Sequence, residues 1–89
     1  MGYKIEFSEF ALKTIKKLDS TARKQILKYI SQVLLRVDDP HLLGKALTGN
    51  FGGFWRYRTG HFRIICKIYD EQMIVLILRV AHRKNAYEE

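Results

Sequence analysis

Three arginines at short spacing carry the clearest chemical signal in this sequence of 89 residues. Arg56, Arg58 and Arg63 lie within one stretch of eight positions. A guanidinium group is permanently charged and can hold a phosphate through two parallel hydrogen bonds. Because side chains alternate along a strand, Arg56 and Arg58 share one face, and Arg63 joins them if the next strand is a neighbour. The spacing predicts a cationic face that binds phosphodiesters.

The remaining basic residues divide by type along the chain. Nine of the 16 precede position 56, and seven of these nine are Lys, which we expect on solvated helix faces. From position 56 onward five Arg accompany only two Lys. Lys67 continues the row of Arg63 by alternation, and Arg83 follows the last predicted strand. Arg79 either joins this face or closes the edge of the sheet.

Two further residues have both a chemical and a structural interpretation. His82 could exchange a proton near pH 7, or it could be an ordinary polar residue at a strand end. Tyr87 is either an anchor packed on the sheet or an aromatic platform on which a base stacks. Composition alone leaves both alternatives open.

The elements that must position these residues follow from the apolar periodicity. Residues 3–7 alternate as a strand, and Ser8 can cap a helix that runs to about Leu18. Ser20 can cap a second helix, which we expect to continue to Val37 and to end at the Asp38-Asp39-Pro40 segment. The period then changes to two, which predicts three more strands, at residues 54–58, 61–69 and 73–81.

This order, β-α-α-β-β-β, predicts one α+β domain spanning residues 1–89. Two N-terminal helices are expected to pack on one face of a small, twisted, mainly antiparallel sheet and to leave the other face open. Trp55, Tyr57 and Cys66 fall on the face toward the helices, so we expect them in the core. The basic residues then gather on the open face.

Composition excludes several classes of protein. A net charge of +7 favours a polyanion or an acidic protein as partner. Cys66 is the only cysteine, so there is no disulfide framework, and no Cys or His pair has zinc-ligand spacing. The longest apolar run, residues 73–78, is far too short for a membrane span, and no secretion signal precedes it. We therefore expect a cytoplasmic protein with no membrane partner, no metal and no cofactor.

Two segments resemble a known family. Residues 55–63, WRYRTGHFR, resemble the R-x-R-x-G-x-aromatic-R segment of the RelE/ParE family of bacterial toxins. Residues 79–87, RVAHRKNAY, are similar to that family's closing strand and its H-R-x-x-x-Y ending. The predicted element order extends the resemblance over nearly the whole chain.

The resemblance implies a toxin of a type II toxin-antitoxin system with one of two activities. RelE-type members cut mRNA in the ribosomal A site, and ParE-type members poison DNA gyrase without nuclease activity. Arg83 and Tyr87 match the ending of the RNase branch, which favours a ribosome-dependent mRNA endonuclease that inhibits translation. The alternatives are a gyrase inhibitor and a noncatalytic RNA-binding domain. A cognate acidic antitoxin is expected as partner, with DNA bound only through that antitoxin.

The same resemblance implies roles for individual residues. Arg63 would stabilise charge on the scissile phosphate, Arg83 would assist the leaving group and Tyr87 would stack on a base. Arg56 belongs beside them in the catalytic set. The remaining RNA-binding positions are Arg58, Lys67, Arg79 and Lys84.

The sequence departs from the family pattern where a proton acceptor would be needed. RelE has Lys at the positions that align with Phe54 and Arg56. A related branch carries Glu where this chain has Lys45, so no general base is assigned. We hypothesise that His82 shares the acid and base work, or that positioning on the ribosome supplies most of the rate. No metal is required, because the attacking group is the 2′-hydroxyl of the RNA.

Overall fold

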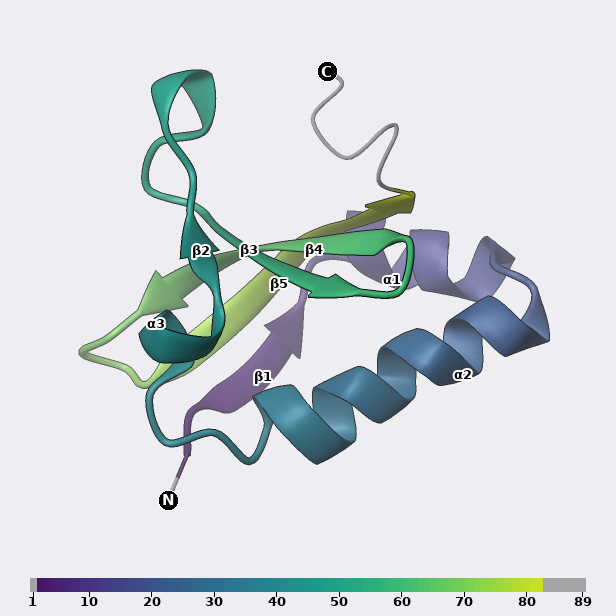
Figure 1. Cartoon of the computed structure of the whole chain (residues 1–89), viewed down its shortest axis with the longest axis horizontal. Coiled ribbons are helices and arrows are strands. Elements are labelled where there is room, and N and C mark those ends of the chain that lie inside the picture. The colour runs from purple at the N-terminus through teal and green to yellow at the C-terminus, as the bar shows by residue number, and fades with distance from the viewer. Residues whose placement is uncertain (1, 83–89) are drawn as a thin grey trace.

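The computed structural model describes residues 2–82, so Arg83, Lys84 and Tyr87 lie outside the described residues. Two main helices accompany a five-stranded sheet of order β1-β5-β4-β3-β2, in which β1 runs parallel to β5 and all other pairs are antiparallel (Figure 1). The predicted α+β class is confirmed. The elements in chain order are β1 (Lys4–Phe7), α1 (Glu9–Lys17), α2 (Ser20–Tyr29), α3 (Pro40–Leu43), β2 (Lys45–Ala46), β3 (Trp55–Thr59), β4 (Phe62–Tyr69) and β5 (Ile74–His82).

The helix starts follow from capping side chains. The Ser8 hydroxyl accepts a hydrogen bond from the Ala11 amide at the start of α1, as predicted. The second helix is capped by Asp19, whose carboxylate accepts from the Ala22 amide, and not by Ser20. Regular α-helix ends at Tyr29, and one wider π-helical turn continues to Leu34, so the expected end at Val37 is a few residues too far.

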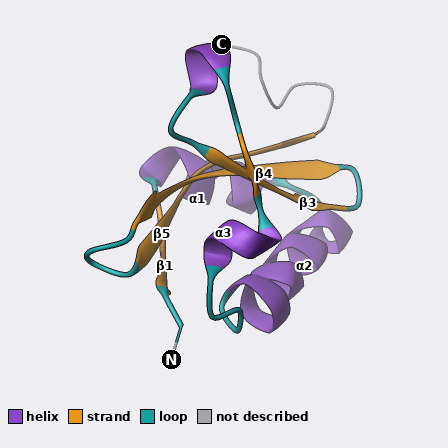
Figure 2. Cartoon of the chain, turned by 60° about the vertical axis from the view of Figure 1, so that its left-hand side comes forward, coloured by secondary structure: helices purple, strands orange, loops and turns teal. Residues whose placement is uncertain are grey.

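A single apolar core lies between the two helices and one face of the sheet. Ala11 and Ile15 of α1 and Ile26 of α2 pack in the same cluster as side chains from β3, β4 and β5. In Figure 2 the strands form a strongly twisted sheet with α2 and α3 on one side of it. Trp55, Tyr57 and Cys66 take part in this packing, which confirms their predicted place on the helix side. The buried strand residues of this cluster are Tyr57, Ile64, Cys66, Val75, Ile77 and Val80.

A β-bulge in β5 decides which side chains reach the opposite face. Ile65 pairs with Arg79 and Cys66 pairs with Ile77, so Leu78 is the extra residue. Without a bulge, alternation from the inward-facing Ile77 would turn Arg79 into the core. The extra residue instead directs Arg79 to the open face and returns Val80 to the core.

Two elements between α2 and β3 were not predicted from the sequence. Asp39 caps the short helix α3, and Pro40 occupies its first turn, where a missing N–H costs little. The two-residue strand β2 then pairs with the first half of β3. The loop between β2 and β3 projects away from the sheet (Figures 1 and 2). Among the described residues, no helix has the length and apolar composition needed to cross a membrane.

A polar cluster fastens α3 to the turn between β4 and β5. His41 Nδ1 lies 2.8 Å from the Asp39 carboxylate, and His41 Nε2 lies 3.3 Å from the carboxylate of Asp70. Asp70 also accepts a hydrogen bond of 2.8 Å from the Tyr3 hydroxyl. The hydrogen bonds from His41 lower the pKa of Asp39 below its ordinary value. The ionised form of Asp39 is therefore the one that the folded state favours.

We expect Asp39→Asn to lower the thermal unfolding midpoint by a few degrees at pH 7 and by almost nothing near pH 2. Asn keeps the capping oxygen but loses the charge. Because the folded pKa of Asp39 is depressed, its contribution is present above the unfolded pKa of about 4 and is lost as pH falls through the folded value. Thermal melts of the wild type and Asp39→Asn between pH 2 and pH 7 measure this difference in midpoint. An equal difference at both pH values would contradict the assignment.

Candidate functional site

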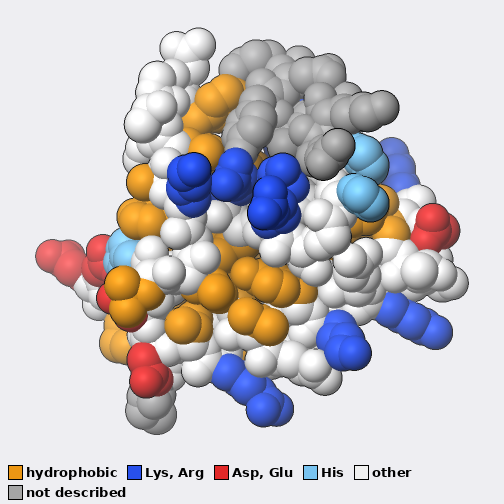
Figure 3. All heavy atoms as spheres, in the orientation of Figure 1, with side chains coloured by type: hydrophobic (Ala, Val, Ile, Leu, Met, Phe, Trp, Pro, Cys, Tyr) orange, Lys and Arg blue, Asp and Glu red, His pale blue; other side chains and the backbone are white. Residues whose placement is uncertain are grey.

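The open face of the sheet brings together arginines from three strands. Arg58 of β3 lies directly opposite Arg63 of β4, and Arg56 lies opposite Ile65. Ile65 also pairs with Arg79 on its other side, so β5 adds a fourth guanidinium group. Figure 3 shows Lys and Arg side chains gathered beside a hydrophobic area on one side of the molecule. The predicted convergence of Arg56, Arg58 and Arg63 on one face is thus present in the structure.

Arg63 is the arginine of this face that has a buried donor atom without a partner among residues 2–82. Its Nη1 atom is buried and has no hydrogen-bond partner among the described residues. Like charges directly opposite each other on a sheet are destabilising, so Arg58 adds to the cost of holding Arg63 there. A buried donor without a partner costs about 1–3 kcal/mol. An anion bound at this point would relieve both costs, and it would receive hydrogen bonds from a fixed direction.

An apolar pocket adjoins the arginines on the open face. It has a volume of about 410 Å³ and lies between the start of α1, the loop before β3 and the β5 bulge. Phe10, which is 60% exposed, is its most accessible large side chain. The residues that line it are Ser8, Phe10, Phe51, Phe54, Ile65, Leu78 and Arg79. A basic surface beside an exposed apolar pocket can hold an amphipathic acidic segment as well as a nucleic acid.

This fold and this arginine cluster agree with the comparison to known families. Residues 5–87 match the family described as "ParE toxin of type II toxin-antitoxin system, parDE". The chain belongs to this toxin family. As predicted from the resemblance, the toxin is a RelE-like member. It is 30% identical over 87 residues to the mRNA interferase toxin RelE of Escherichia coli K12, covering 97% of this chain and 88% of that protein. It is 31% identical to toxin RelG of Mycobacterium tuberculosis over 98% of both chains.

Solved structures of toxins share the fold. The toxin-antitoxin complex RelBE2 from Mycobacterium tuberculosis superposes with a TM-score of 0.84 at 30% identity, covering 93% of this chain and 100% of that chain. The isolated RelE toxin of E. coli gives a TM-score of 0.69 at 26% identity, with 91% of this chain and 84% of that chain covered. The chain therefore has the same fold as solved toxins of this family.

The toxin's sheet does not bring every predicted residue to Arg63. Lys67 lies four residues further along β4, roughly 13 Å away, with its Nζ 5.3 Å from the ring centroid of Tyr69. His82 pairs with Phe62, which packs toward the helices, and its ring stacks 5.9 Å from that of His61. His82 therefore lies on the helix side of β5, opposite to the face that carries the arginines. The expected role of His82 in proton transfer at Arg63 is not supported by this position.

Other predicted residues of the toxin fall outside residues 2–82: Arg83, Lys84 and Tyr87. Sequence reasoning also missed the apolar pocket. Phe10 offered a signal, because an aromatic residue next to Ala11 on α1 lies off the stripe formed by Ala11 and Ile15. Phe54 also offered one, because alternation in the predicted strand 54–58 puts it on the face of Arg56. Phe51 offered none, because its loop is positioned only by the tertiary structure.

Proposed function

We propose that the toxin is an endoribonuclease that cuts mRNA in the ribosomal A site and thereby stops translation. The observation that carries this proposal is the set of arginines on the open face, among them Arg63, whose buried Nη1 has no partner within residues 2–82. The relatives named mRNA interferase RelE support it, because they match nearly the full length of the chain.

The proposed reaction is attack by the RNA's own 2′-hydroxyl. Its oxygen forms a bond to the adjacent phosphorus as its proton is removed. The bond from phosphorus to the 5′-oxygen then breaks, and that oxygen takes up a proton. The products are a 2′,3′-cyclic phosphate and a 5′-hydroxyl, so the chemistry requires no metal-bound water. The pentacovalent intermediate carries extra negative charge, which is where fixed guanidinium groups act.

Arg63 is proposed to stabilise that charge, with Arg56 and Arg58 holding the phosphate from the neighbouring strand. Arginine stays protonated at neutral pH, so it stabilises charge well and removes protons poorly. In this proposal Arg83 assists the departing 5′-oxygen and Tyr87 stacks on a base, as the resemblance implies. Positioning of the substrate by the ribosome supplies much of the remaining rate. The proposed site does not include His82.

Arg79, Lys67 and Lys84 are proposed to hold more distant phosphates. Each such contact releases counterions and makes binding weaker as salt rises. Arg79 has the best support among them, since the bulge directs it to the arginine face.

A cognate antitoxin is the proposed protein partner. Solved relatives include toxin-antitoxin complexes from Mycobacterium tuberculosis and E. coli. A basic face next to the apolar pocket at Phe10 suits an acidic, amphipathic segment that would cover both. DNA would be contacted only through this antitoxin.

Inhibition of DNA gyrase is the second candidate function, because the matching family is described as a ParE toxin. In that case the same basic surface would contact a protein, and no RNA bond would break. The two candidate functions differ in their first effect in the cell: the nuclease cuts mRNA, and the gyrase inhibitor reduces DNA supercoiling.

We expect primer extension on mRNA from a translating lysate to show new ends inside A-site codons within minutes of toxin addition. Plasmid supercoiling, measured in parallel, should stay normal at that time. Arg83→Ala should abolish the new ends if the ending of the chain acts as the resemblance implies. Loss of supercoiling with intact mRNA would instead establish the gyrase-directed alternative.

A further inference from the structure

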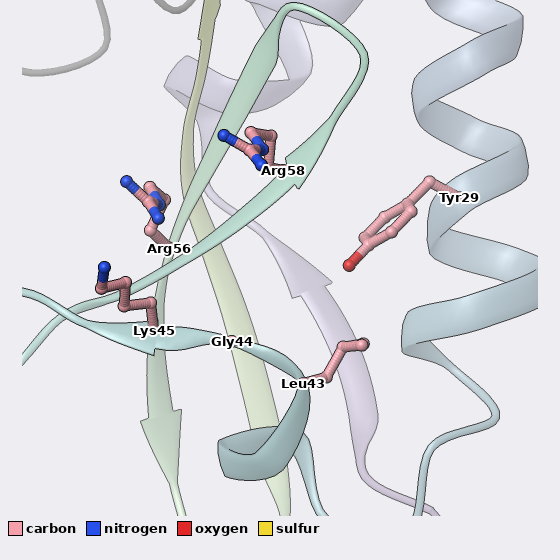
Figure 4. Close-up of a pocket in the computed structure, with 6 residues that line it drawn as sticks. All are labelled: Tyr29, Leu43, Gly44, Lys45, Arg56 and Arg58. Atoms are coloured by element: carbon pink, nitrogen blue, oxygen red, sulfur yellow. The ribbon is translucent and has the colours of Figure 1, made fainter.

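A second pocket lies at the outer edge of β3, next to the arginine face. The two-residue strand β2 pairs only with Trp55 and Arg56, so the rest of that edge has no neighbouring strand in the part of the chain that the structure describes. A pocket of about 350 Å³ lies beside this edge, a volume at the small end of the range for ligand sites. Figure 4 shows cations from β2 and β3 on one side of it and a tyrosine from α2 facing them. Its lining residues are Tyr29, Leu43, Gly44, Lys45, Arg56 and Arg58.

Three cations line the basic side of this pocket. Lys45 and Arg56 are cross-strand partners, and Arg58 follows on the same face of β3. Lys45 and Arg58 are exposed, and neither side chain forms a hydrogen bond or an ion pair with another described residue. Cations that share one cavity repel each other, so the pocket is suited to an anion.

Tyr29 and Leu43 give the pocket a different chemistry on the other side. The ring of Tyr29 packs against the core, and its hydroxyl points from α2 toward the edge formed by β2 and β3 (Figure 4). That hydroxyl has no hydrogen-bond partner among the described residues. Burial raises the pKa of Tyr29, so the hydroxyl remains a neutral donor at physiological pH. Leu43, 38% exposed, adds an apolar wall. A ligand with a phosphate at one end and a less polar body at the other fits these residues.

We infer that this pocket is a subsite for one nucleotide of the RNA strand, next to the phosphodiester held at Arg63. Arg58 connects the two places, because it lines the pocket and lies directly opposite Arg63. Adjacent strands are about 4.8 Å apart, so the outer edge of β3 lies within roughly 10 Å of β4. The phosphate is bound by Lys45 and Arg58 and accepts a hydrogen bond from Tyr29, while the sugar and base contact Leu43. The inference rests on the proposed function, since it takes RNA as the substrate of the open face.

NMR titration of the full chain tests the subsite without any cleavage. The probes are inorganic phosphate, adenosine 5′-monophosphate and a trinucleotide whose 2′-O-methyl groups prevent attack on the phosphate. We expect the trinucleotide to shift the amide signals of Gly44, Lys45, Arg58 and Arg63, and to bind at least tenfold more tightly than the mononucleotide. The mononucleotide should shift the pocket signals alone. Equal affinity for both would show a site for free nucleotides, equal affinity for phosphate would show a simple anion site, and either result overturns the inference.

Two variants test the assigned contacts. Tyr29→Phe keeps the ring in place and removes only the hydroxyl, so we expect about fivefold to tenfold weaker trinucleotide binding with an unchanged thermal midpoint. Lys45→Gln should reduce the slope of log affinity against log salt by about 0.7, the value for one phosphate contact on a single strand. Lys13→Gln removes the same charge from the exposed surface of α1 and should leave the affinity and the slope unchanged. The inference fails if Tyr29→Phe binds like the wild type, or if Lys13→Gln matches Lys45→Gln.

The subsite and the nuclease activity can fail separately. Trinucleotide shifts at Lys45 and Arg58 together with intact mRNA in the lysate would retain the subsite and overturn the nuclease. Cleavage in the lysate with no shifts at these two residues would retain the nuclease and overturn the subsite.

Discussion

Replacing Arg63 with alanine should lower the rate of RNA cleavage by about 100-fold to 1,000-fold, the usual loss when one fixed donor to a developing negative charge is removed. Arg63 is central on the open face, with Arg58 directly opposite and a buried Nη1 that has no partner among the described residues. A bound phosphodiester supplies the missing acceptor, and the attack increases its charge. Single-turnover cleavage on programmed ribosomes measures the loss.

The same substitution should leave the thermal unfolding midpoint unchanged or higher. Truncation removes a buried donor that lacks a partner within residues 2–82 and relieves the repulsion with Arg58. These gains offset the lost packing of the alkyl chain. Arg63→Lys retains the charge without the planar fork, so its rate should lie between those of the wild type and the alanine variant. Arg36→Ala removes an equal charge from an exposed position outside the sheet and should cut normally. A destabilised Arg63→Ala protein, or one with wild-type rates, would show that Arg63 is a structural residue.

The faces of β3 and β4 could be predicted from the sequence because alternation is a local property of a strand. Once Tyr57 and Ile64 are assigned to the core, Arg58 and Arg63 must face the other way. Alternation was less informative for β5, where the bulge intervenes. Ile77 and Val80 are both buried although they are three residues apart, which no regular strand allows. In the sequence, Leu76, Leu78 and Val80 also fit one regular apolar row, so the spacing of apolar residues carried no signal of the bulge that redirects Arg79.

The pocket at the edge of β3 could not be predicted, because it depends on contacts between distant segments. Tyr29 continues a helix with no motif of its own, and Lys45 reaches the site only because α3 and β2 follow the edge of β3. His82 shows that a sequence motif can also suggest a role that the strand register does not support. Its neighbours along the chain suggested a catalytic role, but register with Phe62 turns it toward the helix side. Strand alternation predicted the arginine cluster and the motif resemblance assigned roles within it, but the resemblance did not identify which face a residue at the strand end would take.

Tyr57→Ala should be the most destabilising substitution of a single aromatic residue in the fold. Tyr57 is 1% exposed, and its hydroxyl donates a hydrogen bond of 2.7 Å to the Pro40 carbonyl. Its ring also approaches Gly44 so closely that a Cβ there would lie 2.8 Å from the ring. Truncating a buried aromatic residue costs about 3–5 kcal/mol, a large part of the roughly 5–15 kcal/mol that stabilises a small domain. We expect the thermal midpoint to fall by roughly 15–30 °C, whereas Tyr69→Ala, on the exposed surface, should change it little.

Tyr57→Phe separates the hydrogen bond from the packing. Loss of the bond leaves the Pro40 carbonyl without this donor and should cost about 1 kcal/mol at pH 7. Burial raises the pKa of Tyr57 above its ordinary value, so the folded state favours the neutral phenol. Its contribution is therefore complete below the unfolded pKa of about 10 and declines as pH rises toward the folded value. Chemical denaturation at pH 7 and pH 11 should show the wild type losing more stability than Tyr57→Phe over this interval. If both proteins lose the same amount, the Tyr57 hydroxyl is not held neutral by burial, and the segment from Pro40 to Gly44 that borders the pocket must be fastened by other contacts.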